Sequence, residues 1–186
     1  MGEYQHISHT FSPVYDNNSE ILILGSFPSV KSREQGFYYG HAQNRFWKVI
    51  ASICNQEVPK TIEEKKELLL TNHIAIWDVI DSCDIIGSSD SSIKNVVPAD
   101  IAGLLAKTKI QRIFANGKTA GKLYEKFSKE STGMEITILP STSPANASFS
   151  LERLIVEWKE QIKEIDKKIK SKKLSESEVA YIAGSQ

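Results

Sequence analysis

Short apolar runs alternate with helical patterns through most of the chain. Apolar runs bounded by turn residues predict buried strands at residues 21–25, 74–77, 110–115 and 135–139. Apolar residues at helical spacing and N-terminal capping signals predict helices at residues 45–55, 61–71, 98–107 and 117–129, and one beginning near residue 150. Strands that alternate with helices favour a parallel sheet with helices on both faces.

The predicted fold is therefore an α/β protein, a three-layer α/β/α sandwich around a short four-stranded parallel sheet. In such sheets, ligands bind outside the carboxyl ends of the strands. The loops after residues 25, 77, 115 and 139 are thus where we expect functional side chains.

Length and composition narrow the class of protein. The chain of 186 residues suits one domain, expected at residues 1–170, with a flexible charged tail at residues 171–186. Lys plus Arg and Asp plus Glu both number 23, and this balance argues against broad adhesion to nucleic acid or anionic membranes. With two cysteines and no apolar run of about 18 residues, we expect a reduced, cytoplasmic, monomeric protein that does not span a membrane.

Several familiar motifs fail. Gly117-Lys118-Thr119 resembles the end of a phosphate-binding loop, but Arg112 stands where that motif needs its first glycine, so we interpret it as a strand-to-helix turn. The nucleophile motif of α/β-hydrolases is absent. His6 and His9 have no carboxylate beside them in sequence, so we interpret them as surface residues and predict no metal site.

The cysteines also carry no signal for catalysis. Cys54 lies on a predicted helix and Cys83 in a predicted loop, and no basic residue flanks either of them. Because a reactive thiolate needs such an electropositive neighbourhood, both are interpreted as inert thiols.

One loop does point to a ligand. Phe37, Tyr38 and Tyr39 are consecutive, which is neither helical nor strand spacing, and the amides Gln43 and Asn44 follow closely. Aromatic faces and amide edges together suit a planar base. A loop that packs its own aromatic side chains over the sheet would have the same composition, and the residues alone leave both interpretations open.

Three blocks lie at these predicted loops. They are Gly25-Ser26-Phe27-Pro28-Ser29, Gly40-His41-Ala42-Gln43-Asn44-Arg45-Phe46-Trp47-Lys48 and Leu139-Pro140-Ser141-Thr142-Ser143-Pro144-Ala145-Asn146. They resemble motifs of the uracil-DNA glycosylase superfamily, in particular of its hypoxanthine-DNA (deoxyinosine) glycosylase branch. The middle block is similar to one of the G:U/T mismatch-specific branch, with Ala42 where that branch usually has proline. Trp77-Asp78-Val79 and Gly87-Ser88-Ser89-Asp90 also resemble the hypoxanthine branch.

The resemblance implies a base-excision repair enzyme. It would hydrolyse the N-glycosidic bond of a deaminated base flipped out of DNA, with hypoxanthine preferred and uracil as a second substrate, and would use no cofactor or metal. Phe27 and Leu139 stand where classical members carry Asp and His, and the resemblance to the hypoxanthine branch assigns the catalytic role to Asn44. The Asn44 carbonyl would hold the attacking water. No lysine is placed to form a Schiff base, so the enzyme would be monofunctional and leave the strand uncut.

The resemblance also assigns binding roles. Tyr39 would stack on the base over a floor of Ser26, Phe27 and Pro28, and Asp78 would either accept a base N–H or anchor Ser82 or Ser89. Ser141 and Ser143 would bind phosphate, and residues 142–145 would form a wedge that fills the space of the flipped nucleotide; a proline-rigid turn is the simpler interpretation of that loop. The implied base-binding set is Gly25, Ser26, Phe27, Pro28, Tyr39 and Asp78, and the DNA-binding set is Ser29, Ser141, Thr142, Ser143, Pro144, Ala145 and Asn146.

A modest basic rim would accompany this site despite the zero net charge. Its members would be Lys31, Arg33, Arg45, Lys48, Lys118 and Lys122. Three other functions remain open from the sequence: a non-catalytic module of the same fold that binds damaged DNA, a G:U/T mismatch-specific uracil-DNA glycosylase, and an enzyme that acts on free nucleosides.

Overall fold

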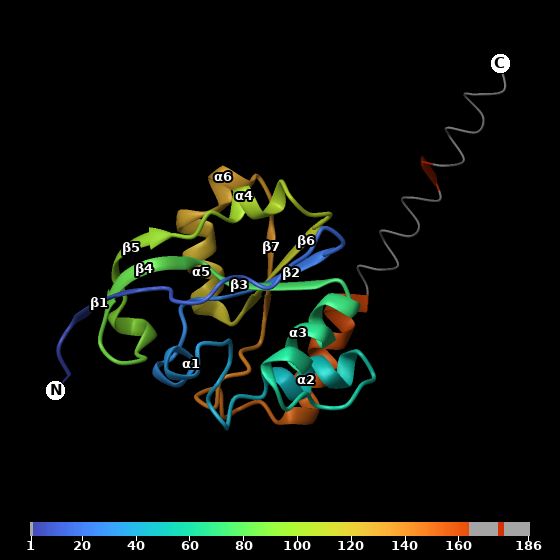
Figure 1. Cartoon of the computed structure of the whole chain (residues 1–186), viewed down its shortest axis with the longest axis horizontal. Coiled ribbons are helices and arrows are strands. Elements are labelled where there is room, and N and C mark those ends of the chain that lie inside the picture. Colours follow the sequence, from blue (N-terminus) through green and yellow to red (C-terminus); the bar gives the residue numbers. More distant parts are fainter. Residues whose placement is uncertain (1, 164–174, 177–186) are drawn as a thin grey trace, which may run out of the picture.

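The computed structural model describes residues 2–163 and 175–176, and contains two sheets flanked by helices (Figure 1). The central sheet consists of β2 (Ile21–Gly25), β3 (Ile74–Asp78), β6 (Arg112–Asn116) and β7 (Ile136–Leu139). Its strands are all parallel, in the order β3-β2-β6-β7. The predicted four-stranded parallel sheet is therefore confirmed. The predicted tail lies outside the described residues except for 175–176.

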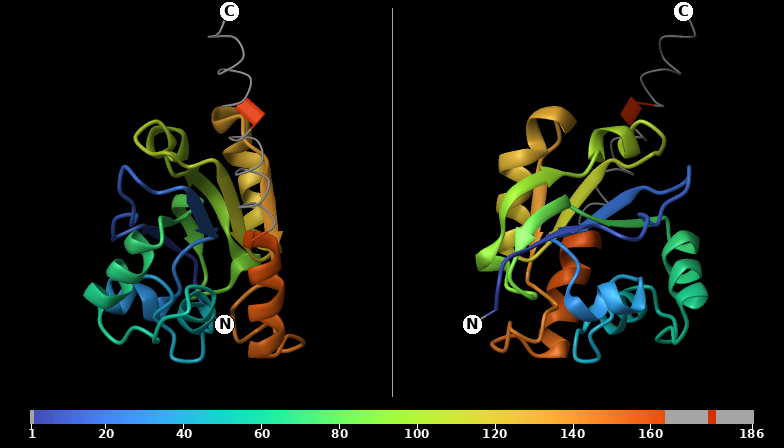
Figure 2. Two further views of the ribbon diagram at one scale, coloured as in Figure 1. Left: turned by 90° about the vertical axis from the view of Figure 1, so that its right-hand side faces the viewer. Right: turned by 60° about the vertical axis from the view of Figure 1, so that its left-hand side comes forward.

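Alternate residues of the central strands pack into two separate cores. Ile23 and Phe114 face one core, which holds α2 (Phe46–Ile53), α3 (Ile62–Thr71) and a helix over residues 151–163. Leu22 and Leu24 face the other, which holds α4 (Ile101–Leu105) and α5 (Lys118–Phe127). Figure 2 shows the helices on the two sides of the sheet. This arrangement confirms the predicted three-layer sandwich, because strands buried on both faces need cover on both.

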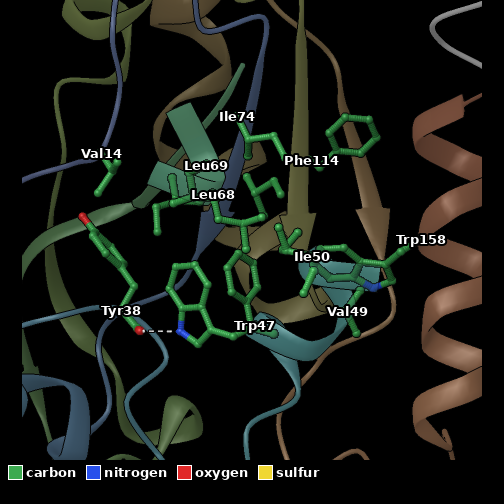
Figure 3. Close-up of a cluster of buried hydrophobic side chains, with 14 of the residues drawn as sticks. Val14, Tyr38, Trp47, Val49, Ile50, Leu68, Leu69, Ile74, Phe114 and Trp158 are labelled. Carbon is green, nitrogen blue, oxygen red and sulfur yellow. Dashed lines mark hydrogen bonds between the residues drawn. The ribbon is translucent and has the colours of Figure 1, made fainter. Parts of the chain in front are cut away.

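The core on the α2 side fixes the aromatic loop that precedes this helix (Figure 3). Phe46 and Trp47 enter the core from the first turn of α2, and the Trp47 indole Nε1–H donates to the Tyr38 carbonyl over 3.2 Å. Phe37 lies parallel to the Trp47 ring at 6.0 Å between ring centroids. Phe37 and Tyr38 are thus core residues, which leaves Tyr39 as the member of the triplet that is only partly buried.

A second sheet was not predicted from the sequence. The strands β1 (Gln5–Ser8), β4 (Ile80–Ile85) and β5 (Lys94–Pro98) pair antiparallel in the order β1-β4-β5. Two predictions are corrected here. Pro98 ends a strand and does not begin a helix, since α4 begins after the Asp100 cap, whose side chain accepts from the Gly103 N–H over 2.9 Å. Cys83 lies within β4 and not in a loop.

Three short helical segments complete the described part. They are α1 (Val30–Gln35), the 3₁₀ turn η1 (Asp90–Ser92) and α6 (Lys129–Thr132). Ser29 caps α1 through its side chain, which accepts from the Ser32 N–H. Within the described residues, no helix is long and apolar enough to cross a membrane.

Candidate active site

A cavity of about 580 Å³ lies at the carboxyl ends of the central strands. Each strand delivers one wall: Gly25 ends β2, Asp78 ends β3, Asn116 ends β6, and Ser141 follows β7. The loops predicted to carry function therefore meet at one pocket. Of the predicted base-binding residues, all of Gly25, Ser26, Phe27, Pro28, Tyr39 and Asp78 line it, together with Asn44. From the predicted DNA-binding set, Ser29, Ser141, Thr142, Ser143 and Pro144 line it as well.

The floor of the pocket is built around the missing side chain of Gly25. A methyl group at this position would overlap the Asp78 Oδ1 and would lie 3.2 Å from the Tyr39 hydroxyl oxygen. Only glycine therefore leaves room for these two polar atoms to converge on the same patch of floor. One of them is a hydrogen-bond acceptor and the other carries a donor proton.

The Asp78 carboxyl group is held by a residue that sequence reasoning dismissed. The His9 Nε2 lies 2.8 Å from the Asp78 Oδ2, and the two side chains are 3% and 5% exposed. His9 is thus buried, which corrects its interpretation as a surface residue, and neither Ser82 nor Ser89 bonds to Asp78 among the described hydrogen bonds. His6 is exposed but also pairs with a carboxylate, Asp84, at 2.8 Å. His6 lies in β1 and His9 directly follows it, and nothing local in the sequence signals their pairing with these aspartates.

Tyr39 lines the pocket, and its hydroxyl group is itself buried. Its ring stacks on Phe46 with 3.9 Å between centroids, and its backbone has φ of 53°. The hydroxyl is buried and has no hydrogen bond among the described residues. Burial raises the pKa of this hydroxyl and the nearby Asp78 raises it further, while Asn116 opposes the rise. The Tyr39 hydroxyl is therefore a neutral donor that has no acceptor among the described residues.

Asn44 is fixed through its carbonyl oxygen. The Oδ1 accepts from the Phe46 backbone N–H over 2.9 Å and from the Thr142 hydroxyl over 2.8 Å. The Thr142 hydroxyl in turn accepts from the Asn116 Nδ2 over 2.9 Å. An amide oxygen has two lone pairs, and both are used here. In this arrangement the group of Asn44 left for a ligand is the Nδ2 amide, a donor, and the role of its carbonyl in holding a water stays a prediction.

The loop after β7 divides into a buried base and an exposed tip. Thr142 is fully buried, whereas Pro144 and Ala145 are exposed. Asn146 closes the loop through its Nδ2, which donates to the Ser141 carbonyl over 3.0 Å. Thr142 therefore cannot be part of an exposed wedge, and the surface that could enter DNA narrows to Pro144 and Ala145. We call these two residues the loop tip.

The predicted basic rim is smaller than expected. The Arg45 guanidinium donates to backbone carbonyls of the 142–149 segment, and the Arg33 guanidinium donates to the carbonyls of Pro28 and Gly87. Lys31 lines the pocket at its exposed rim and pairs with Glu34 at 2.9 Å. The remaining members of the rim, Lys48, Lys118 and Lys122, are exposed.

Asp90 is a pocket residue that sequence reasoning did not single out for a role. It lies at the exposed rim, where its Oδ1 accepts from the Ser26 hydroxyl over 3.1 Å. Surrounding pocket atoms desolvate its carboxyl group and raise its pKa, the Ser26 hydrogen bond lowers it, and Asp78 raises it. The pocket thus holds two carboxyl groups, those of Asp78 and Asp90.

Neither cysteine is activated for chemistry. Burial raises the pKa of Cys54 and of Cys83 to about 11, so both are thiols near neutral pH. Across the described residues, no group of three or more His, Cys, Asp or Glu side chains is arranged to hold a metal ion.

Comparison with known proteins places this pocket in a family. The chain matches the Uracil DNA glycosylase superfamily over residues 12–166. It is 38% identical to a Methanosarcina acetivorans protein named hypoxanthine DNA glycosylase over 149 residues, which cover 79% of this chain and 93% of the relative. A Methanosarcina barkeri protein of the same name is 35% identical over 156 residues, covering 82% and 96%.

A solved structure is similar as well. The solution NMR structure of a Methanosarcina acetivorans protein, assigned to the uracil DNA glycosylases, has a TM-score of 0.69 at 38% identity and covers 80% of this chain and 92% of its own. The fold is that of a three-layer α/β protein with a pocket at the ends of its central strands. The family match then identifies the chain as a member of the Uracil DNA glycosylase superfamily.

Proposed function

We propose that this protein is a DNA glycosylase that removes hypoxanthine, and related deaminated bases, from DNA. Two relatives that share most of their length with this chain are named hypoxanthine DNA glycosylase. The observation that carries the proposal is the convergence of two polar atoms over Gly25, the Asp78 Oδ1 and the Tyr39 hydroxyl, of which the hydroxyl has no hydrogen bond among the described residues. A donor beside an acceptor is the complement of a base edge on which a carbonyl stands beside a ring N–H.

Deamination of adenine or cytosine creates that edge, which guanine and thymine already carry. Hypoxanthine offers a carbonyl oxygen to the Tyr39 hydroxyl and a ring N–H to Asp78, and uracil offers the same pair of groups. Because Phe46 already covers one face of Tyr39 and the hydroxyl points to the floor, we assign Tyr39 a hydrogen bond to the base in preference to stacking. His9 holds Asp78 in the orientation that accepts the N–H.

The reaction is hydrolysis of the N-glycosidic bond. The bond between the sugar C1′ and the base nitrogen breaks, and its electron pair leaves with the base. A water oxygen bonds to C1′ and loses a proton, while the base gains one, so the products are an abasic site and the free base. Asn44 contributes its Nδ2 amide as a donor to the negative charge that develops on the departing base. Because an amide is not a general base near neutral pH, a catalytic Asn44 favours departure of the base before attack by water.

Access to the base requires a flipped nucleotide. The loop tip, Pro144 and Ala145, is the exposed apolar surface beside the pocket that would fill the space left in the duplex. Lys31 is the pocket lysine that could form a Schiff base, and it pairs with Glu34 at the solvent-exposed rim. We therefore propose a monofunctional enzyme that leaves the strand uncut.

Excision from labelled duplexes tests the proposal. Duplexes that carry hypoxanthine, uracil in a G:U pair, thymine in a G:T pair or xanthine are incubated with the protein and analysed with and without alkali. We expect the hypoxanthine strand to break only after alkali. Breakage without alkali would indicate lyase activity, and Lys31→Met would then be compared. Binding to the hypoxanthine duplex without any abasic product would favour the non-catalytic module, and product from G:U or G:T alone would favour the mismatch-specific enzyme.

A further inference from the structure

The Arg45 side chain donates to several backbone carbonyl groups of the loop after β7. Its Nε donates to the Thr142 carbonyl over 3.3 Å, and its Nη2 donates to the carbonyls of Ser143 and Asn146 over 2.8 and 3.1 Å. Its Nη1 donates to the Phe149 carbonyl, and the Arg45 backbone N–H donates to the Thr142 carbonyl over 3.1 Å. One guanidinium thus joins four carbonyl groups of the 142–149 segment.

This set of contacts determines the shape of the loop. The segment forms neither a helix nor a strand, and its backbone N–H groups at Ser143 and Ala145 are met by hydroxyls of its own serines at 3.2 Å. Its carbonyls need donors as well, since buried backbone groups left without a partner are costly. Arginine has five N–H donors in a rigid plane and no acceptor, so one guanidinium can donate to several carbonyl groups that surround it.

This set of contacts also connects to Asn44, the proposed catalytic residue. Arg45 follows Asn44 directly, and the Asn44 Oδ1 accepts from the Thr142 hydroxyl over 2.8 Å. Asn44 and Arg45 therefore both bind Thr142: the Asn44 Oδ1 accepts from its hydroxyl, and the Arg45 Nε donates to its carbonyl. The loop tip lies two residues further along and is exposed. The position of the tip relative to Asn44 depends on these bonds.

We propose that Arg45 is a positioning residue that presents the loop tip to the duplex in register with Asn44, and that it does not bind phosphate. The proposal rests on the proposed glycosylase function. It assigns Arg45 to the step in which the nucleotide is flipped, because an apolar tip is needed only where a base pair must be opened and its place filled. A base in a single strand has no such requirement.

The test compares two substrates of the same sequence. Single-turnover excision of hypoxanthine is measured on a duplex and on the corresponding single strand, for the unvaried protein and for Arg45→Met. We expect the duplex rate to fall by about a hundredfold, as for a small displacement of a positioned group, and the single-strand rate to change far less. Lys107→Met is the control, since Lys107 is an exposed cation that follows α4 and does not line the pocket.

Arg45→Lys keeps a charge and fewer donors, and should show a smaller duplex-specific loss; it also replaces Arg45→Met if that variant fails to fold by circular dichroism. Equal losses on the two substrates would overturn the proposal, because general damage to the fold lowers both. Unchanged rates on the duplex would overturn it too.

A flipping signal separates this inference from the proposed function. A duplex that carries 2-aminopurine beside hypoxanthine gains fluorescence when the stack opens. If the unvaried protein raises this fluorescence without releasing the base, the glycosylase proposal fails, and the Arg45 proposal still requires the signal to be lost in Arg45→Met. If the unvaried protein neither raises the signal nor releases the base, both proposals fail.

Discussion

Removal of the His9 imidazole should destabilise the protein far more than removal of His6. Both histidines contact an aspartate at 2.8 Å, but the His9–Asp78 side chains are 3% and 5% exposed and the His6–Asp84 side chains 62% and 24%. His9→Ala leaves the Asp78 carboxyl group buried without its partner, which costs about 3–5 kcal/mol in comparable buried pairs. For a domain of this size, that loss lowers the Tm by roughly 6–20 °C.

Thermal unfolding followed by circular dichroism measures the difference. His6→Ala is the matched control and should melt close to the unvaried protein, because exposed pairs contribute little. The His9 ring also packs on Phe11 with 4.6 Å between centroids, so part of the loss comes from packing. Repeating His9→Ala in an Asp78→Ala background isolates the pair, since only the packing loss remains there. If His9→Ala destabilises no more than His6→Ala, or equally in both backgrounds, the reasoning is wrong.

Two further predictions concern single pocket groups. Tyr39→Phe removes a buried hydroxyl that has no partner, so the free protein should gain about 1–3 kcal/mol in unfolding free energy while excision of hypoxanthine slows; a rate equal to that of the unvaried protein would restore a stacking role. Asp90→Asn should have the same Tm as the unvaried protein at pH values below 3.8, the ordinary pKa of aspartate, and a progressively higher Tm above that pH. The raised pKa keeps the Asp90 carboxyl group of the folded protein protonated while that of the unfolded chain ionises, so the unvaried protein loses stability as the pH rises. Melting curves from pH 3 to pH 7 check this, and a Tm difference independent of pH would contradict it.

Local patterns were sufficient to predict the central sheet and the edge at which the site lies. Runs such as residues 21–25 are apolar on both faces, and this pattern is confirmed by strands buried between two cores. The second sheet was not predicted, for two reasons. Asp81, Ser82 and Asp84 interrupt the apolar pattern of β4, and β1 pairs with a strand that is distant in the sequence. Pairings of this kind depend on tertiary contacts that a window of sequence does not contain.

The sequence predicted where the candidate site lies, but not the hydrogen bonds between its residues and distant parts of the chain. Asn44 and Tyr39 reach the pocket as expected, yet His9 and Arg45 act through partners that lie 69 and about 100 positions away. One of the contacts of Asn44 did have a local signal. Asn44 stands two residues before Phe46, where α2 begins, and asparagine at such a position commonly bonds to the backbone N–H two residues on. That pattern uses the carbonyl oxygen that had been assigned to a water.

Asn44→Asp tests most directly the claim that the pocket works by donating hydrogen bonds to the departing base. An aspartate keeps oxygens for the Phe46 N–H and the Thr142 hydroxyl, so the fold and the loop stay in place, but it has no Nδ2 donor. Single-turnover excision of hypoxanthine from duplex DNA by Asn44→Asp should fall by about a hundredfold or more, as when one preorganised donor is lost. A rate equal to or above that of the unvaried protein would contradict the account, because it would show that an oxygen at this position, and not an amide hydrogen, serves the reaction.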